Sequence, residues 1–339
     1  MSSTQTVLVE TPRALRNSTA RLLLIATLIL CIACQASQTS VAAVYTYTPI
    51  DGAHDQWLLG THWSAPPVSA ATTELTFVAD NATVLGNSLT NTNTNDITGA
   101  FSLNILDLQG TGPASGAATI NINSSSTSNY LNFVSNSATT PVVNLNALAG
   151  AAGLTYNVKS NITLTDNTTF QGIGTAKFKF GGIISGNGGL TKSGTSTLIL
   201  SGGNTYSGLT TISGGTISFA NKALDTAGGI VFDGGTLQWS GTNTQDISDR
   251  IAPIASGKSA ILDTNGNNIS FAAGLSGLGG LTKIGPGVLT LAGANTYTGN
   301  TTISAGTLAL QHTNTLRTCF ENHFSVLASR LDIRVIMAT

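Results

Sequence analysis

A unit of 36 residues that occurs twice constrains the fold of this chain more than any other feature of its sequence. Residues 184–219 return without a gap as residues 275–310, and the two copies are identical at 21 of 36 positions. The shared residues are mostly Gly, Thr, Leu, Asn and Tyr, and one lysine is the only shared charge. A unit that keeps its turn-forming and packing residues is typical of a repeat architecture rather than of a duplicated catalytic site.

Each copy shows the periodicity of short β-strands. Apolar residues alternate with small polar ones over runs of about four to six residues, and Gly-rich or Asn-rich turns separate the runs. Leu198 and Ile217 hold similar places in successive runs, and the interval between them is the expected length of one coil. This spacing predicts an all-β parallel β-helix, a solenoid that buries one stripe of side chains. The residues expected to point inward are Leu198, Leu200, Ile212, Ile217 and Phe219 in the first copy and Leu289, Leu291, Ile303, Leu308 and Leu310 in the second.

The motifs of the two copies also resemble a known family. The motifs GGLTK, TLILSGGNTYSG and TTISGGTISF, with their counterparts in the second copy, resemble the autotransporter-associated β-strand repeat, also called the passenger-associated transport repeat. Residues 229–237, GIVFDGGTL, are similar to the linking coils of that family. The resemblance implies a right-handed β-helix, the passenger of a bacterial secreted or surface-displayed protein. It implies no catalytic residues, and we assign no catalytic, metal-binding or cofactor-binding residue.

The composition agrees with a solenoid of strands and turns. Charged residues make up 9% of the chain, and Thr, Ser, Asn and Gly are abundant, a mixture that favours strands and turns over helices. A disordered low-complexity chain is the alternative, but the mean hydropathy of +0.21 and the regular Leu and Ile positions argue against it. Residues 44–316 hold 8 Lys or Arg and 12 Asp or Glu, a net charge of −4 that disfavours nucleic acid and anionic membranes.

The first 43 residues predict an export signal. Three arginines within residues 13–21 precede an uncharged apolar run, residues 22–34, and Val41 and Ala43 supply the small residues of a cleavage site after position 43. The apolar run is shorter than the roughly 20 residues that a permanent transmembrane helix needs. We therefore expect a signal peptide at residues 1–43 and no stable membrane span in the mature chain.

Cysteine usage is consistent with export. All three cysteines, Cys31, Cys34 and Cys319, lie outside residues 44–316, so stacking alone has to hold the β-helix. The family resemblance gives the same expectation, because passengers that cross an outer membrane unfolded usually lack disulfides. A lipoprotein signal ending at Cys34 is an alternative, although Cys31 stands three residues before it, where Leu is usual.

The segment 44–69 holds the densest group of special side chains. His54, Asp55 and His62 suggest a metal site, but their spacing matches no standard zinc or calcium pattern, and no fourth ligand is evident. The alternative is an N-terminal cap in which Trp57 and Trp63 cover the open end of the solenoid. We expect the cap.

Between the cap and the first copy, alternation continues but the repeat is degenerate. Polar runs at residues 90–95 and 124–129 are expected to be turns, and stacked Asn and Thr at equivalent corners are expected to form hydrogen-bonded ladders. The predicted strands are LTFVAD, FSLNILDL, ATININ, YLNFV, PVVNLNAL, LTYNV, NITLTD and KFKF.

Four charged residues between the copies permit an enzymatic interpretation. Some β-helical enzymes place acids along one face to cleave polysaccharides, and glycosidase chemistry needs paired carboxylates. The acids here lie in turns at irregular spacing, and the repeat itself contains none. The residues in question are Asp246, Asp249, Arg250 and Asp263.

The tail, residues 317–339, differs abruptly from the rest of the chain. It has 5 charged residues in 23 and no Gly. We expect an end that is not native passenger sequence, either out of frame or truncated. The alternative is a cap that closes the last coil with one short helix through Phe320, Phe324, Leu327 and Leu331.

These observations predict an exported structural or adhesive surface protein that displays an extended face to glycans or proteins, after contact with a translocation machinery during export. The alternatives are a β-helical polysaccharide-degrading enzyme and a passenger fragment with no independent role. The expected segments are a signal peptide (1–43), an N-terminal cap (44–69), a β-helix (70–316) that contains both copies, and the atypical tail (317–339).

Overall fold

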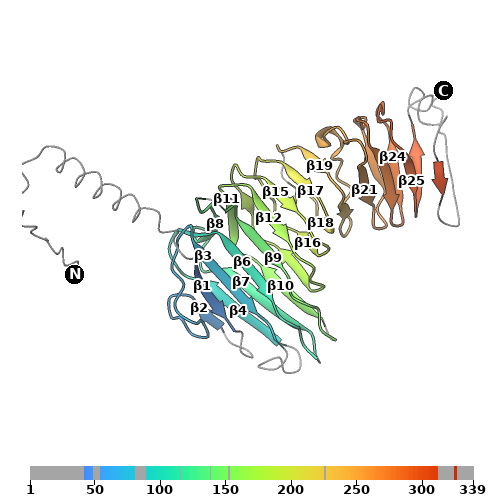
Figure 1. Ribbon diagram of the computed structural model, residues 1–339. Helices are drawn as coiled ribbons and strands as arrows, with labels where there is room; N and C mark the ends of the chain where they lie inside the picture. Colours follow the sequence, from blue (N-terminus) through green and yellow to red (C-terminus); the bar gives the residue numbers. More distant parts are fainter. Residues whose placement is uncertain are drawn as a thin grey trace, which may run out of the picture. The chain divides into compact units, whose positions relative to one another are not determined.

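The computed structural model describes residues 42–48, 54–80, 89–114, 116–137, 139–151, 153–224, 227–311 and 324–326. Within these residues the chain is all-β apart from one 3-10 helix, η1 (Ser248–Arg250), and all strand pairs of its sheets are parallel (Figure 1). This confirms the parallel β-helix. The signal-peptide prediction lies outside the described residues except at its last two positions, and it stays a prediction.

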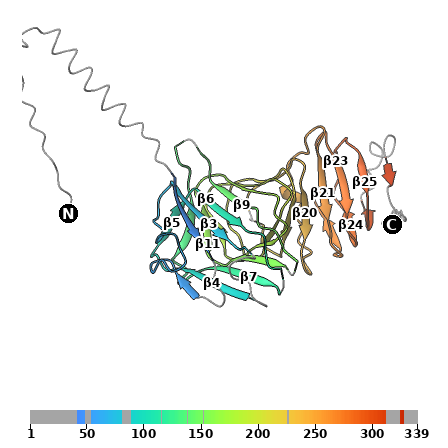
Figure 2. The same cartoon turned by 60° about the horizontal axis from the view of Figure 1, so that its bottom comes forward.

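Two long sheets run along the helix, and strands that follow each other within a sheet belong to successive coils. Figure 2 shows β4 and β7 on one face and β3, β6 and β9 on another. The eight-stranded sheet consists of β1 (Ala43–Tyr47), β3 (Thr73–Val78), β6 (Ile105–Gln109), β9 (Val142–Leu145), β12 (Thr168–Gln171), β15 (Leu190–Lys192), β17 (Thr210–Ile212) and β19 (Ile230–Phe232). The twelve-stranded sheet consists of β2 (His54–Gln56), β4 (Leu89–Asn95), β7 (Ala118–Ser124), β10 (Leu154–Val158), β13 (Lys177–Phe180), β16 (Thr197–Leu200), β18 (Thr216–Phe219), β20 (Thr236–Trp239), β21 (Ser259–Asp263), β23 (Gly280–Ile284), β25 (Thr301–Ile303) and β27 (Phe324–Val326).

Two shorter sheets supply a further face at each end of the helix. The four-stranded sheet consists of β5 (Ala100–Leu103), β8 (Tyr130–Phe133), β11 (Asn161–Leu164) and β14 (Ile184–Ser185). The three-stranded sheet consists of β22 (Ile269–Phe271), β24 (Val288–Leu291) and β26 (Thr307–Leu310).

The coils are wide at the start of the β-helix and narrow in the repeat copies. Leu75 pairs with Leu106, whereas Leu198 pairs with Ile217. One coil therefore takes about 30 residues in the first case and about 20 residues in the second, both within the usual range for stacked repeats. We call the coils from β1 to β9 the wide coils, and those from β15 to β20 and from β21 to β26 the narrow coils. The coil length expected from the sequence is that of the narrow coils.

The core of the narrow coils contains the predicted residues. All ten side chains expected to point inward are buried, and the most exposed of them, Leu310, is 7% exposed. In the second copy Leu289 pairs with Leu308, which matches the pairing of Leu198 with Ile217 in the first. The repeat thus places the same residue types on the same inward ladder in both copies.

The two copies do not continue the same sheets. The first strand of the first copy to pair in a long sheet, β15, belongs to the eight-stranded sheet, whereas its counterpart β23 belongs to the twelve-stranded sheet. This change of sheet occurs in the coil between β20 and β21, where Leu237 pairs with Leu262 and η1 lies in the connecting segment. This coil is longer than its neighbours, and its extra residues shift the second copy by one strand position relative to the first.

One predicted turn is wrong. Residues 90–95 form most of β4, and their inward side chains are Asn91, Asn93 and Asn95, each fully buried. Polar composition alone indicates a turn, but amides of this strand find hydrogen-bond partners inside the coil. The turn predicted at residues 124–129 is confirmed where β7 ends and Asn129 N donates to Ser126 O at 3.1 Å.

The predicted strand FSLNILDL is two strands. It divides at Asn104 into β5 and β6, which lie in different sheets. Asn104 Nδ2 holds this corner by donating to Val134 O at 2.9 Å and Thr139 O at 3.2 Å. In the tail, Phe324–Val326 forms β27 and pairs with β25, so this part is a strand and not a helix. The origin of the tail stays a prediction.

Candidate functional site

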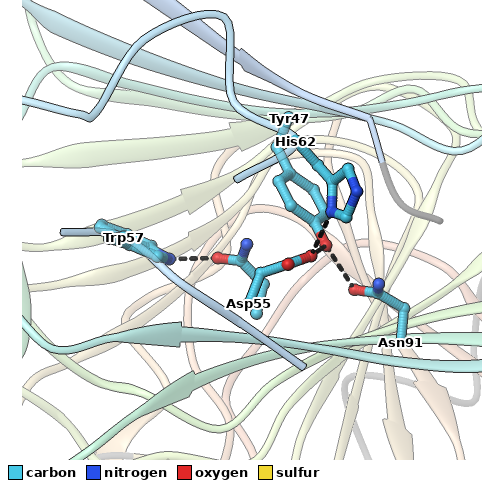
Figure 3. Close-up of polar contacts among 6 residues, drawn as sticks. Tyr47, Asp55, Trp57, His62 and Asn91 are labelled. Carbon is cyan, nitrogen blue, oxygen red and sulfur yellow. Dashed lines mark hydrogen bonds and ion pairs between the residues drawn. The ribbon is translucent and has the colours of Figure 1, made fainter. Parts of the chain in front are cut away.

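The segment singled out in the sequence forms a polar cluster inside the first wide coil (Figure 3). Tyr47 at the end of β1 donates its hydroxyl to the Asp55 carboxylate, and the same hydroxyl lies 3.0 Å from Asn91 Oδ1. His62 Nδ1 lies 3.0 Å from Asp55 Oδ2. Strands β1, β2 and β4 and the turn after β2 thus bring these four polar side chains together.

The cluster is largely buried, and burial affects the pKa of Tyr47. Asp55 is 5% exposed and His62 is 25% exposed. Burial, together with the hydrogen bond to Asp55, raises the pKa of Tyr47 well above its usual value. Tyr47 therefore remains a hydrogen-bond donor at physiological pH. His62 has φ of 62°, in the left-handed region that a non-glycine residue seldom occupies.

Aromatic rings enclose the cluster. Trp57 is fully buried and donates its Nε1 to Asn93, and Trp63 is 7% exposed. The ring centroids of Trp57 and Phe101 are 4.9 Å apart in an edge-to-face contact, and those of Trp63 and Phe77 are 5.3 Å apart. The two tryptophans thus pack inside the first coil. This arrangement supports our proposal that residues 44–69 cap the solenoid.

The metal hypothesis finds only two of its three residues together. Asp55 and His62 pair, while the side chain of His54 lies outside the described atoms. In the part of the chain that the structure describes, no group of three His, Cys, Asp or Glu is placed to hold a metal ion.

The acids between the copies hold turns. The two oxygens of Asp246 accept backbone N–H groups of Ser248 and Ala272, each at 2.8 Å. Asp263 is the last residue of strand β21 and not part of the expected turn, and it accepts hydrogen bonds from Asn265 N at 2.8 Å and from Gln238 Nε2 at 2.7 Å. Both carboxylates are thus used in turn and strand contacts.

The other two residues of that group lie in the single 3-10 turn of the described chain. Asp249 and Arg250 belong to η1, and Arg250 Nε donates to Gly228 O at 2.9 Å. This hydrogen bond joins the segment between β20 and β21 to the preceding coil.

Polar ladders run along the outer faces of the sheets. Asn157 Nδ2 donates to Asn121 Oδ1 at 2.9 Å on the twelve-stranded sheet, and Gln171 Nε2 donates to Asn144 Oδ1 at 3.0 Å on the eight-stranded sheet. Amide side chains therefore link neighbouring coils on the strand faces, whereas the Asn and Thr ladders were expected at the corners. Both of these bonds join residues that are paired across neighbouring coils.

A pair of acids on the eight-stranded sheet was missed by sequence reasoning. Asp107 is 6% exposed, and burial raises its pKa. Burial and the charge of Asp107 together raise the pKa of Glu74. The acids lie on the neighbouring strands β3 and β6. They are far apart in the sequence, and without the coil register their proximity has no sequence signal.

A groove of about 370 Å³ crosses the outer face of the second copy. Its lining includes four glycines together with Lys258, Ser259, Thr282 and Asn300. Ser259 Oγ and Thr282 Oγ1 lie 2.9 Å apart, and Lys258 forms an ion pair with Asp233 at 2.6 Å. The groove thus offers hydroxyl and amide groups with little uncompensated charge.

The fold defines the class of protein: a parallel β-helix built partly from transport repeats. The family model of the passenger-associated transport repeat matches residues 190–219 and 281–310, which confirms the resemblance at both copies. No solved structure matches the chain significantly. Within the described residues, we find no apolar helix of the length that a membrane crossing requires.

Part of the chain is also similar to a protein of known class. The chain is 38% identical over 141 residues to the adhesin BmaC autotransporter of Brucella suis biovar 1 (strain 1330). The match covers 37% of this chain and 4% of that protein, so the chain spans a small part of the relative. The repeats and this similarity mark the chain as an exported or cell-surface protein that resembles an adhesin passenger.

Proposed function

We propose that this chain is a non-enzymatic adhesive module whose polar outer faces bind glycans or proteins of other cells or of the extracellular matrix. The observation that carries the proposal is the groove over the second copy, bounded by Lys258, Ser259, Thr282 and Asn300. The similarity to an adhesin passenger supports the same class of function.

The mechanism is display on a rigid scaffold. Parallel strands repeat at about 4.8 Å, so the β-helix holds its outer hydroxyl and amide groups at fixed intervals. Each hydrogen bond to a ligand contributes little alone, but a row of them along one polymer binds as a set without the cost of ordering the protein. Glycine in the lining allows a flat sugar ring or an extended peptide to approach the backbone.

The low charge of the groove sets the kind of ligand. Because Asp233 pairs with Lys258, a neutral glycan or polar peptide fits better than a polyanion. Binding to such a ligand depends on hydrogen bonds and changes little with salt concentration, unlike binding to a polyanion.

The test compares the same substitution in the two copies. Thr282→Arg places a long cation in the groove, and Thr191→Arg places it at the equivalent position of the first copy, which is a matched control. The mature protein is titrated against immobilised glycans and matrix proteins, and its melting temperature is recorded. We expect Thr282→Arg to weaken binding at least tenfold and Thr191→Arg to leave it unchanged.

Three outcomes contradict the proposal. Equal effects of the two substitutions place binding outside the groove. Release of soluble oligosaccharides by the wild-type protein supports a polysaccharide-degrading enzyme instead. The absence of any binding by a folded wild-type protein supports the fragment alternative.

A further inference from the structure

The one charge shared by both copies lies inside the β-helix. Lys192 in β15 and Lys283 in β23 are both 0% exposed and point inward. Lys192 stands on the ladder between Phe170 and Ile212. A lysine at an inward position of an apolar ladder requires partners for its ammonium group, because an unpaired buried charge is strongly unfavourable.

The partners are turn carbonyls. Lys283 Nζ donates to Ile284 O at 2.8 Å, to Gly285 O at 2.7 Å and to Ala305 O at 3.2 Å. These three bonds use the three protons of an ammonium group. The first two carbonyls lie at the end of β23 and in the turn after it, and the third belongs to the turn of the following coil. One side chain therefore joins two successive coils.

The first copy repeats the first of these three bonds. Lys192 Nζ donates at 2.6 Å to the carbonyl oxygen of Ser193, the counterpart of Ile284. The shared lysine thus reaches the same corner in both copies, although the two copies lie in different sheets.

A glycine in the following coil completes the arrangement. Gly215 and Gly306 have φ of 60° and 72°, and a β-carbon added at either would lie 2.8 Å from the ammonium nitrogen of Lys192 or Lys283. The same added atom would lie closer still to backbone carbonyl oxygens: 2.3 Å from Ser196 O and 2.6 Å from Gly194 O in the first copy, and 2.4 Å from Gly287 O and 2.6 Å from Gly285 O in the second. Only glycine fits both the left-handed backbone and the space beside the ammonium.

We propose that each lysine and its glycine form a clamp that locks the two coils of a transport repeat into one cooperative folding unit. The lysine lies in the first coil of the pair and the glycine in the second. The family match at residues 190–219 begins with β15 and ends with β18, so it spans this pair of coils. The two copies continue in different sheets, and this change occurs in the longer coil between β20 and β21. That coil lies outside both clamped pairs.

The experiment is native-state hydrogen exchange on the mature protein, with peptides covering β23–β24 and β25–β26. In the wild type we expect the two coils to open together, with the same exchange rates for their slowest amides. In Lys283→Met we expect β25–β26 to exchange at least tenfold faster than β23–β24. Lys258→Met, at a half-exposed lysine paired with Asp233, is the matched control and should behave as the wild type.

A double-mutant cycle tests the link between the two residues. If Gly306 leaves room for the ammonium, Gly306→Ala should lower the melting temperature less in the Lys283→Met background than in the wild type. Additive effects, unchanged exchange, or equal acceleration of both coils would each overturn the clamp and leave Lys283 as packing alone. Lys192→Met, which has the same position in the first copy, replaces Lys283→Met if that variant does not fold.

Discussion

The wide and narrow coils bury polar groups in different ways. In the wide coils, polar side chains bind each other across the interior, as Trp57 does with Asn93 and Tyr47 with Asp55. In the narrow coils of the repeats, the buried charge is a lysine that binds turn carbonyls. The difference follows from the length of the coil. About 30 residues enclose room for a side-chain network, whereas about 20 bring the turns within reach of one side chain.

The comparison predicts where the solenoid is weakest. Trp63 Nε1, Asn93 Nδ2 and Asn95 Nδ2 are buried in the wide coils without a hydrogen-bond partner among the described residues. An unsatisfied buried donor costs about 1–3 kcal/mol. In the described part of the repeats, Ser196 Oγ is the buried side-chain atom without such a partner. We therefore expect the wide coils to have lower local stability per buried residue than the repeats.

The largest effect is expected from a charge in the narrow core. Leu200 is fully buried between Phe180 and Phe219 on adjacent strands. Leu200→Asp leaves a charge with no partner, which costs several kcal/mol, so we expect the coils on both sides to unfold. Ile199→Asp, on the outward neighbour, is the control and should keep most of the stability. Thermal unfolding followed by circular dichroism measures both, and an unchanged melting temperature for Leu200→Asp contradicts the core assignment.

The second effect is a pH dependence that belongs to the narrow coils. Burial lowers the pKa of Lys192 and of Lys283 from 10.5 to about 8, although the nearby Asp263 opposes this shift at Lys283. Between these two pKa values the unfolded chain therefore binds more protons than the folded chain. The free energy of unfolding rises with pH in this window, by up to about 3 kcal/mol for each lysine, and is flat below it.

Denaturant titrations at intervals from pH 7 to 10.5 measure this slope. The double variant Lys192→Met and Lys283→Met should lose it, while Lys258→Met should retain it. A slope that persists in the double variant assigns the pH dependence to other groups.

The third effect contrasts two buried tryptophans. Trp57→Phe leaves Asn93 without its partner inside a wide coil, and we expect a loss of about 1–3 kcal/mol. Trp239→Phe in a narrow coil frees only Gln245 O, a partly exposed loop carbonyl that water can reach, so the loss should be smaller. Chemical denaturation of the two variants compares them. A larger loss of unfolding free energy for Trp239→Phe than for Trp57→Phe would contradict the expectation that the wide coils depend more on buried side-chain hydrogen bonds.

The repeats were more predictable than the wide coils because their signal is local. Alternation and a constant offset fix the inward residues and the coil register without knowledge of the interior. The strand at Asn91, Asn93 and Asn95 has no such signal, since its polar contacts depend on other parts of the chain: the Tyr47 hydroxyl lies 3.0 Å from Asn91 Oδ1, and Trp57 Nε1 donates to Asn93 Oδ1. Polar composition then predicts a turn, and tertiary hydrogen bonds override it.

The candidate site was predictable in content but not in arrangement. The aromatic residues, Asp55 and His62 stand out in the sequence, yet their assembly around Tyr47 depends on a register between β1, β2 and β4 that no repeat specifies. The different sheet positions of the two copies could not be predicted either. A longer coil between β20 and β21 moves the second copy to another sheet while the repeat sequence stays the same.

The smallest effect is expected on the outer ladders. Gln171 Nε2 donates to Asn144 Oδ1 at 3.0 Å on the outer surface of the eight-stranded sheet, where the exposed Gln171 leaves water free to replace a lost partner. Gln171→Ala should therefore change the free energy of unfolding by about 0.5 kcal/mol or less, although it removes a side-chain hydrogen bond, as Trp57→Phe does inside the coil. The same denaturation measurement compares the two variants. If Gln171→Ala costs as much as Trp57→Phe, the outer ladders help to hold the coils together. If it costs almost nothing, their amide groups are free to bind a ligand at little expense to the fold, as an adhesive face requires.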